Sequence, residues 1–196
     1  MRSKVSERRL EKIKYVLSSR QFDLTLVFEN IHDPHNVSAI LRTCDAIGIN
    51  KVHLVYTIEK FPKLGKKSSA SAIKWVEREK HIDIQSCFQK LRNDNFKIYA
   101  SAISVDSINL YDIDFTEKIA IVFGNEHRGL SKEALEKADR KFIIPVKGMV
   151  QSLNVSVAAA IVLYEAFRQR LNKGLYNKTS LSKEEFEIMV DKWCMK

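Results

Sequence analysis

Hydrophobic residues recur along this chain with two periods, one typical of helices and one of strands. Apolar positions between Glu7 and Ser19 are three and four residues apart, which predicts an amphipathic helix ahead of the main domain. Short apolar runs then alternate with helical patterns. The expected strands are Leu24 to Phe28, Lys51 to Tyr56, Phe96 to Ala102, Lys118 to Phe123 and Lys141 to Ile144. This alternation predicts an α/β domain with a mostly parallel sheet and helices on both faces.

The expected helices follow from the same pattern and from capping residues. They are Asn36 to Ile47, Ile82 to Leu91, Ser131 to Ala138, Leu153 to Gln169 and a last helix from a capping box at Ser182 to about Trp193. The stretch Glu59 to Ser71 is polar and rich in lysine, so we expect an exposed connection there. Because Leu153 to Gln169 is apolar nearly all round, that helix must be covered by the sheet or by a second subunit.

Length and composition place the chain among single-domain globular proteins. With 196 residues, we expect one catalytic domain over residues 22–172, a helical extension over 1–21 and a basic tail with a helix over 173–196. The three cysteines form no C-x-x-C pair, which favours a reducing cytoplasm. No apolar run is long enough to cross a membrane, and the polar N-terminus does not resemble a secretory signal.

The net charge of +9 favours a polyanionic partner such as nucleic acid. Charge alone does not separate this interpretation from a basic enzyme whose lysines only solvate its surface.

Three polar segments follow expected strands, where ligands bind in open α/β sheets. The first begins the second expected helix with Asn36 and carries Arg42 away from its apolar stripe. From spacing alone, a capping Asn with a solvated Arg is the simpler interpretation of these two residues. An active-site pair is the alternative.

The second and third segments are loops. Phe123-Gly-Asn-Glu-His-Arg-Gly-Leu130 places Glu126 between two glycines, which permit close approach of a ligand, although a plain strand-to-helix loop would have the same pattern. Ile144 to Asn154 brings Ser152 and Asn154 to the start of an apolar helix, where capping by Ser152 is the structural alternative.

The sequence lacks the residue patterns that a metal site, a nucleotide-binding loop or a hydrolase nucleophile would require. His32 and His35 are three apart, but no further ligands complete a metal site, so we expect no metal. Neither a phosphate-binding loop, a dinucleotide fingerprint nor a nucleophile elbow is present.

Taken in order, the three segments resemble the signature motifs of the SpoU branch of the SPOUT methyltransferases, over about residues 22–172. The resemblance is greatest to members that methylate a guanosine ribose of tRNA. The matching stretches are Asp33 to Gly48, Phe123 to Gly129 and Ile144 to Ala158.

The resemblance implies a fold and a cofactor. Members of the family have a deep trefoil knot in the C-terminal third of the domain and form homodimers. They bind S-adenosyl-L-methionine, here expected at Ser101, Gly124, Ile144, Ser152 and Leu153.

The resemblance also implies catalytic positions. Arg42 corresponds to the main catalytic residue, and Asn36, Glu126, Ser152 and Asn154 would arrange it or the substrate. The ribose 2′-oxygen attacks the sulfonium methyl, so the site must align the reactants and accept a proton. A guanidinium gives up its proton only with difficulty, so we keep two roles for Arg42, general base and electrostatic orienter.

The implied substrate is the D-loop guanosine at tRNA position 18, because a short N-terminal helix and a C-terminal basic tail are typical of the enzymes acting there. Expected phosphate contacts are Arg8, Arg9, Lys60, Lys63, Lys66, Lys67, Arg168, Arg170 and Lys173. The alternatives are ribose methylation of a tRNA anticodon or of rRNA, and a catalytically silent RNA-binding protein of the same fold.

Overall fold

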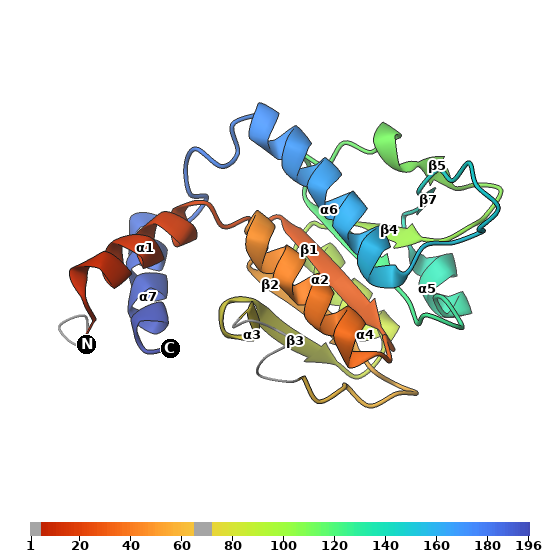
Figure 1. Cartoon of the computed structure of the whole chain (residues 1–196), viewed down its shortest axis with the longest axis horizontal. Coiled ribbons are helices and arrows are strands. Elements are labelled where there is room, and N and C mark those ends of the chain that lie inside the picture. Colours follow the sequence, from red (N-terminus) through yellow and green to blue (C-terminus); the bar gives the residue numbers. More distant parts are fainter. Residues whose placement is uncertain (1–4, 65–71) are drawn as a thin grey trace.

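The computed structural model describes residues 5–64 and 72–196 of the chain, and these form an α/β structure around one parallel sheet (Figure 1). All neighbouring strands run parallel, in the order β3-β2-β1-β6-β4-β7-β5. The strands are β1 (Leu24–Glu29), β2 (Lys51–Val55), β3 (Glu77–His81), β4 (Lys97–Ser101), β5 (Ile108–Asn109), β6 (Ile119–Phe123) and β7 (Arg140–Ile143). The expected mostly parallel α/β sheet is confirmed.

Helices cover both faces of the sheet. They are α1 (Glu7–Ser18), α2 (Pro34–Ile47), α3 (Ala72–Trp75), α4 (Ile84–Asn93), α5 (Lys132–Lys137), α6 (Val155–Asn172) and α7 (Lys183–Cys194), with a 3-10 turn at Leu110–Asp112. Helices α2 and α6 pack side by side on one face, and α4 and α5 cover the other (Figure 1). Strand β1 shows why two layers form, because Leu26 and Phe28 enter the α2 and α6 core while Val27 enters the α4 and α5 core.

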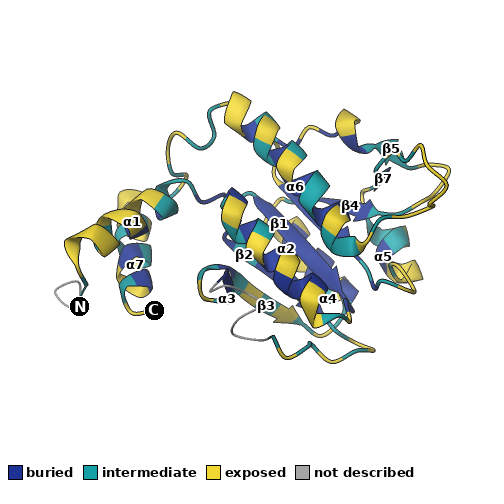
Figure 2. Cartoon of the chain, viewed as in Figure 1, coloured by how far each residue is buried: buried dark blue, intermediate teal, exposed yellow. Residues whose placement is uncertain are grey.

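Helices α1 and α7 pack against each other beside the sheet rather than on it (Figure 2). Ile13, Leu17, Val190 and Trp193 form their small core, and the ring of Trp75 lies 4.8 Å from that of Trp193. The two ends of the described chain therefore form one helical unit joined to the sheet near α3.

Helix boundaries follow local chemistry. The side chain of Asp33 accepts a hydrogen bond from the backbone N–H of His35, and Pro34 occupies the first turn of α2, where its fixed φ suits a helix. The helix ends at Gly48, whose φ of 89° favours glycine. Our assignment of Asn36 as the cap of this helix is wrong, since Asp33 caps it. The expected capping box at Ser182 is confirmed.

Three further expectations need correction. Strand β3 was missed because its sequence, Glu-Arg-Glu-Lys-His, has no apolar member, and β5 was missed because it has two residues. The connection after β2 is not wholly exposed, since Phe61 and Leu64 pack against the core, and its part from residue 65 to 71 lies outside the described residues. The cover expected for helix α6 comes in part from this chain, because α2 and the sheet bury one side of it.

Arg170 is a structural residue rather than a phosphate contact. Its guanidinium is fully buried and bonds to the side chains of Gln21 and Asp23 and to the carbonyl oxygens of Phe115 and Glu117. The end of α6 is thereby tied to the segments that lead into β1 and β6, and our expectation that Arg170 contacts RNA is wrong.

Within the described residues, no helix combines the length and the apolar character that a membrane crossing requires.

Candidate active site

A cavity of about 640 Å³ opens where β4, β6 and β7 end. Its walls include the residue at or just after each of these strand ends, Ser101, Gly124 and Ile144, and the loop residues Ser152 and Leu153. The structure thus brings all five residues expected to contact the cofactor to one cavity, at the end of the sheet where open α/β proteins bind ligands. Its volume is that of a site for a small organic molecule.

The loop after β6 folds back on itself at one side of this cavity. Asn125 and Gly129 exchange backbone hydrogen bonds of 3.0 and 2.9 Å, and Gly129 has a φ of 67°. A Cβ atom at Gly124 would lie 2.4 Å from the backbone of Gly129. Position 124 therefore requires glycine, because a side chain there would push the loop away from the strand end.

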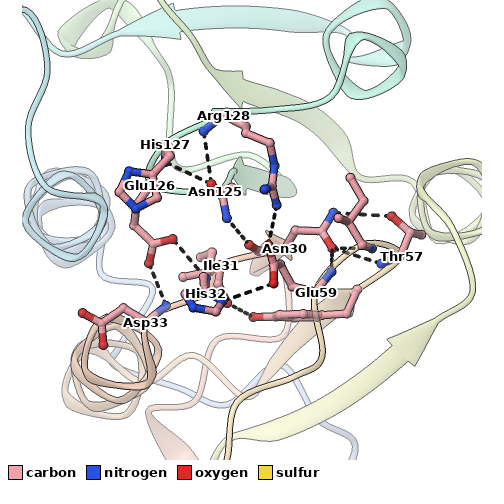
Figure 3. A network of polar contacts seen from close by, with 12 residues as sticks. Asn30, Ile31, His32, Asp33, Thr57, Glu59, Asn125, Glu126, His127 and Arg128 are labelled. Atoms are coloured by element: carbon pink, nitrogen blue, oxygen red, sulfur yellow. Dashed lines mark hydrogen bonds and ion pairs between the residues drawn. The ribbon is translucent and has the colours of Figure 1, made fainter.

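Glu126 of this loop joins the three motifs. Its carboxylate accepts a hydrogen bond of 2.8 Å from the side-chain amide of Asn36, and the carbonyl oxygen of that amide accepts one of 3.1 Å from Asn154. The same carboxylate accepts the backbone N–H groups of His32 and Asp33 (Figure 3). The first turn of α2, the loop after β6 and the start of α6 are thus connected through side chains.

The electrostatics of Glu126 favour its charged form. Burial by itself would raise the pKa of the carboxyl, but the hydrogen bonds from Asn36 and from the backbone of His32 and Asp33 outweigh it and hold the pKa below its ordinary value. Glu126 is therefore an anion that accepts hydrogen bonds and organises its neighbours.

A second network lies beside Glu126. The guanidinium of Arg128 donates to Glu59 at 2.6 Å, and the other carboxylate oxygen of Glu59 lies 3.2 Å from Nδ1 of His32 (Figure 3). The hydrogen bond from Arg128 is the main cause that lowers the pKa of Glu59. This ion pair links the loop after β2 to the loop after β6.

Two asparagines that the sequence analysis missed support these loops. The Asn30 side-chain oxygen accepts the backbone N–H groups of residues 57, 58 and 59, and its φ is 52°. Asn125 is buried, donates to the carbonyl oxygen of Asn30 at 2.8 Å, and accepts the N–H groups of His127 and Arg128 (Figure 3). The only signal in the sequence was an asparagine one or two residues after each of two buried strands.

Asn154, not Ser152, caps α6. Its side-chain oxygen accepts the N–H groups of Ser156 and Val157 while its amide donates to Asn36. Capping by Ser152, the structural alternative from the sequence, is therefore wrong, and Ser152 instead lies exposed on the cavity wall.

Arg42 stands apart from the cavity of its own chain. It is exposed on α2, and within residues 5–64 and 72–196 its side chain has no hydrogen-bond or ion-pair partner. Its cation is therefore available to a molecule outside this chain.

The residues expected to contact RNA differ in their surroundings. Arg8, Arg9, Lys60 and Lys63 are exposed, Arg168 pairs with Glu165 on α6, and Lys173 donates to Thr116. Lys66 and Lys67 lie outside the described residues.

A cavity at the carboxyl ends of a parallel sheet, bordered by a fixed carboxylate and two amides, defines an α/β protein with an enzyme-like site. Residues 23–164 match the model of the SpoU rRNA Methylase family. The chain belongs to this family.

Full-length relatives agree with that assignment. The tRNA (guanosine(18)-2′-O)-methyltransferase of Thermus thermophilus is 44% identical over 191 residues, which cover 97% of this chain and 98% of that protein. The crystal structure of the A. aeolicus TrmH/SpoU tRNA modifying enzyme matches with a TM-score of 0.90 and 41% identity, covering 96% of each chain. The SpoU methyltransferase AviRb from Streptomyces viridochromogenes, solved in complex with AdoMet, shares the fold with a TM-score of 0.69 at 23% identity over 79% of this chain and 62% of that one.

Proposed function

We propose that this protein transfers a methyl group from S-adenosyl-L-methionine to the 2′-hydroxyl of the guanosine at position 18 in the D-loop of tRNA. Membership of a methylase family and 44% identity over nearly the whole of both chains support the reaction and the substrate. The observation that carries the proposal is the chain of hydrogen bonds Asn154–Asn36–Glu126, which unites the three motifs beside a cavity of suitable size.

The cavity fits the proposed cofactor. Its lining combines apolar side chains, for the adenine ring, with exposed polar groups and backbone at Ser101, Gly124 and Ser152. When bound, the cofactor supplies an electrophilic methyl on a sulfonium. Ile144 and Leu153, on the wall formed by the loop between β7 and α6, would hold the adenosine part.

The residues of the chain would act by positioning and charge. The attacking 2′-oxygen must lie in line with the methyl, and its proton must pass to solvent as the new carbon–oxygen bond forms and the bond from the methyl to the sulfonium sulfur breaks. In this proposal the exposed guanidinium of Arg42 stays protonated, orients the phosphate next to the reactive ribose and stabilises negative charge on the 2′-oxygen. Glu126, Asn36 and Asn154 fix the start of α2, the helix that carries Arg42.

A homodimer would complete such a site, because Arg42 does not line the cavity of its own chain. Helix α6 supports this proposal with a row of exposed apolar residues, Val157, Tyr164 and Leu171, on the side that the sheet does not cover. Ala158 and Ala159, which the sequence suggested would let a second helix approach, are instead buried in the core of this chain, and Ala160 is half-buried.

Other parts of the proposal rest on family membership. We expect the C-terminal third of the domain to form a trefoil knot, and we place the protein in the cytoplasm. Residues 1–21 and 173–196 would form a tRNA-binding extension of the domain over 22–172, supported by the packing of α1 against α7 and by exposed Arg8 and Arg9.

The test is transfer of labelled methyl from S-adenosyl-L-methionine to an unmodified tRNA transcript, followed by nuclease mapping of the labelled nucleotide. Label at the ribose of position 18 is the expected result. Label in the anticodon or only on rRNA would retain the reaction and refute the substrate, and binding of tRNA without any transfer would favour a silent RNA-binding protein.

A further inference from the structure

Two histidines and a cysteine meet inside the protein, on the face of the sheet opposite to α2 and α6. His53 lies on β2, His81 on the neighbouring edge strand β3, and Cys87 on α4, which covers both strands. Nδ1 of His53 is 2.9 Å from Nε2 of His81, and the Sγ atom of Cys87 lies within 4.8 Å of both nitrogen atoms. None of these residues belongs to the cavity or the networks described above.

The three donor atoms have the chemistry of a metal site. Imidazole nitrogen and thiolate sulfur are the ligands that zinc and similar borderline-soft divalent ions prefer. His53 and Cys87 are buried and His81 is half-buried, so their donor atoms are shielded from bulk water. The Glu79 carboxylate lies 3.9 Å from Nε2 of His81 and is itself paired with Lys51 at 2.8 Å.

The distances are close to those of a bound ion. With zinc–nitrogen bonds of about 2.0–2.1 Å in a tetrahedron, the two ligand nitrogens lie about 3.3 Å apart. The histidine rings would separate by a few tenths of an ångström, and rotation of the Cys87 side chain would bring its sulfur into range. Of the three residues, His53 also borders a cavity of about 270 Å³ at the amino ends of the strands.

We propose that His53, His81 and Cys87 bind one zinc-like divalent ion, with water as the fourth ligand. On binding, the histidine that donates the hydrogen bond shifts its proton to its other ring nitrogen, so that both facing nitrogens can bind the metal, and the Cys87 thiol releases its proton to solvent. The ion would fasten the edge strand β3 and helix α4 to β2. The ion would thereby stabilise the position of β3, which contains no apolar residue and contributes little to the core.

This proposal departs from our expectation that the protein holds no metal. The two histidines are 28 residues apart in the sequence, and the start of helix α4 lies between His81 and Cys87. The three ligands therefore form no short sequence motif. The parallel pairing of β2 with β3, which the sequence did not predict, brings them together.

The test is titration of the full-length, chelator-treated protein with Co²⁺, a coloured substitute for zinc. A thiolate-to-cobalt charge-transfer band that saturates at one ion per chain is expected. Zn²⁺ should displace the cobalt and raise the Tm of the protein. A folded wild-type protein that shows no such band would overturn the proposal.

Two variants and one matched control assign the band. Cys87→Ser should abolish the band. His81→Gln should weaken metal binding by more than about tenfold, because loss of a residue that only supports a metal ligand already costs about that much. Cys194→Ser, which changes a half-buried cysteine on α7, should leave the band unchanged. A band that persists in Cys87→Ser, or one lost in Cys194→Ser, would place the ion elsewhere and refute the site. Circular dichroism and methyl transfer to tRNA verify that each variant is folded.

Discussion

The two sides of the candidate active site are built differently. On one side, Glu126 of the loop after β6 accepts a hydrogen bond from Asn36 at the start of α2. In the same network Asn125 donates to the carbonyl oxygen of Asn30, whose side chain accepts the backbone N–H of Thr57 in the loop after β2. On the other side, the described residues from Val146 to Ser152 make no side-chain hydrogen bond and no backbone hydrogen bond outside the regular elements. Met149 and Val150 in that loop are exposed although they are apolar.

The difference separates two tasks. Groups that align a ribose for attack must be held in place before the substrate arrives, since displacement by an ångström is enough to lose much of the rate. A loop that wraps a cofactor gains its contacts when the cofactor binds, so it needs no partners of its own beforehand. We therefore expect substitutions on the hydrogen-bonded side to impair catalysis and substitutions in the open loop to act mainly on cofactor affinity.

The largest effect should follow from Arg42→Ala, which removes a cation from α2 without touching either side of the cavity. We expect methyl transfer to fall by about 10²–10³-fold or more, in the range for losing one electrostatic group at a reacting oxygen. Because Arg42 is exposed and has no intrachain partner among the described residues, the fold and cofactor binding should be retained. Transfer rates and calorimetric binding of S-adenosyl-L-methionine measure the two quantities, and full activity in this variant would exclude Arg42 from the mechanism.

The same substitution at two glycines compares the two sides directly. Gly124→Ala would place a Cβ atom 2.4 Å from the backbone of Gly129, and we expect a loss of about 1–3 kcal/mol in the free energy of unfolding. In Gly148→Ala, the added Cβ atom in the open loop has no neighbouring atom within 4 Å. This variant should change the free energy of unfolding by less than about 0.5 kcal/mol. Urea denaturation measures both. Equal stability of the two variants would contradict the contrast between the sides.

Glu126→Gln should slow methyl transfer by about 10–100-fold, because the neutral amide cannot accept all the N–H groups that converge on the carboxylate. The pH dependence gives a second readout. Since the folded pKa of Glu126 lies below the ordinary value of 4.5, the carboxylate stabilises the fold above that value, and its contribution is lost as the pH falls through the lower folded pKa. The stability difference between wild type and Glu126→Gln should therefore be largest near neutral pH and shrink in acid. A difference that does not change with pH would show that the charge of Glu126 is unimportant.

The smallest effect on stability should come from Asn154→Ser, which keeps a side chain able to cap α6 but removes the amide that donates to Asn36. We expect stability to change by a few tenths of a kcal/mol, as for exchanges between good caps, while methyl transfer falls measurably. Asn154→Ala is the comparison, and it should lose about 0.5–2 kcal/mol because the cap is gone. Thermal unfolding and transfer rates distinguish the capping role from the role in the Glu126 network.

The sequence predicted the parts of the fold that depend on apolar periodicity and missed those that depend on pairing. Strands β1 and β6 are buried on both faces and were readily found, whereas β3 is charged and is a strand because β2 provides its hydrogen-bond partners. In the site, the motifs indicated Asn36, Glu126 and Asn154, but not that these side chains bond to one another. Asn30 and Asn125 escaped notice because an asparagine after a strand looks like ordinary turn chemistry, and its role depends on a loop distant in sequence.

The most direct measurement of the central claim compares two tRNAs that differ by one oxygen atom. Labelled methyl transfer would be followed with an unmodified tRNA and with the same tRNA carrying 2′-deoxyguanosine at position 18. We predict label in the first and none in the second, since the second lacks the attacking oxygen. Equal labelling of both tRNAs would contradict methylation of the ribose at position 18.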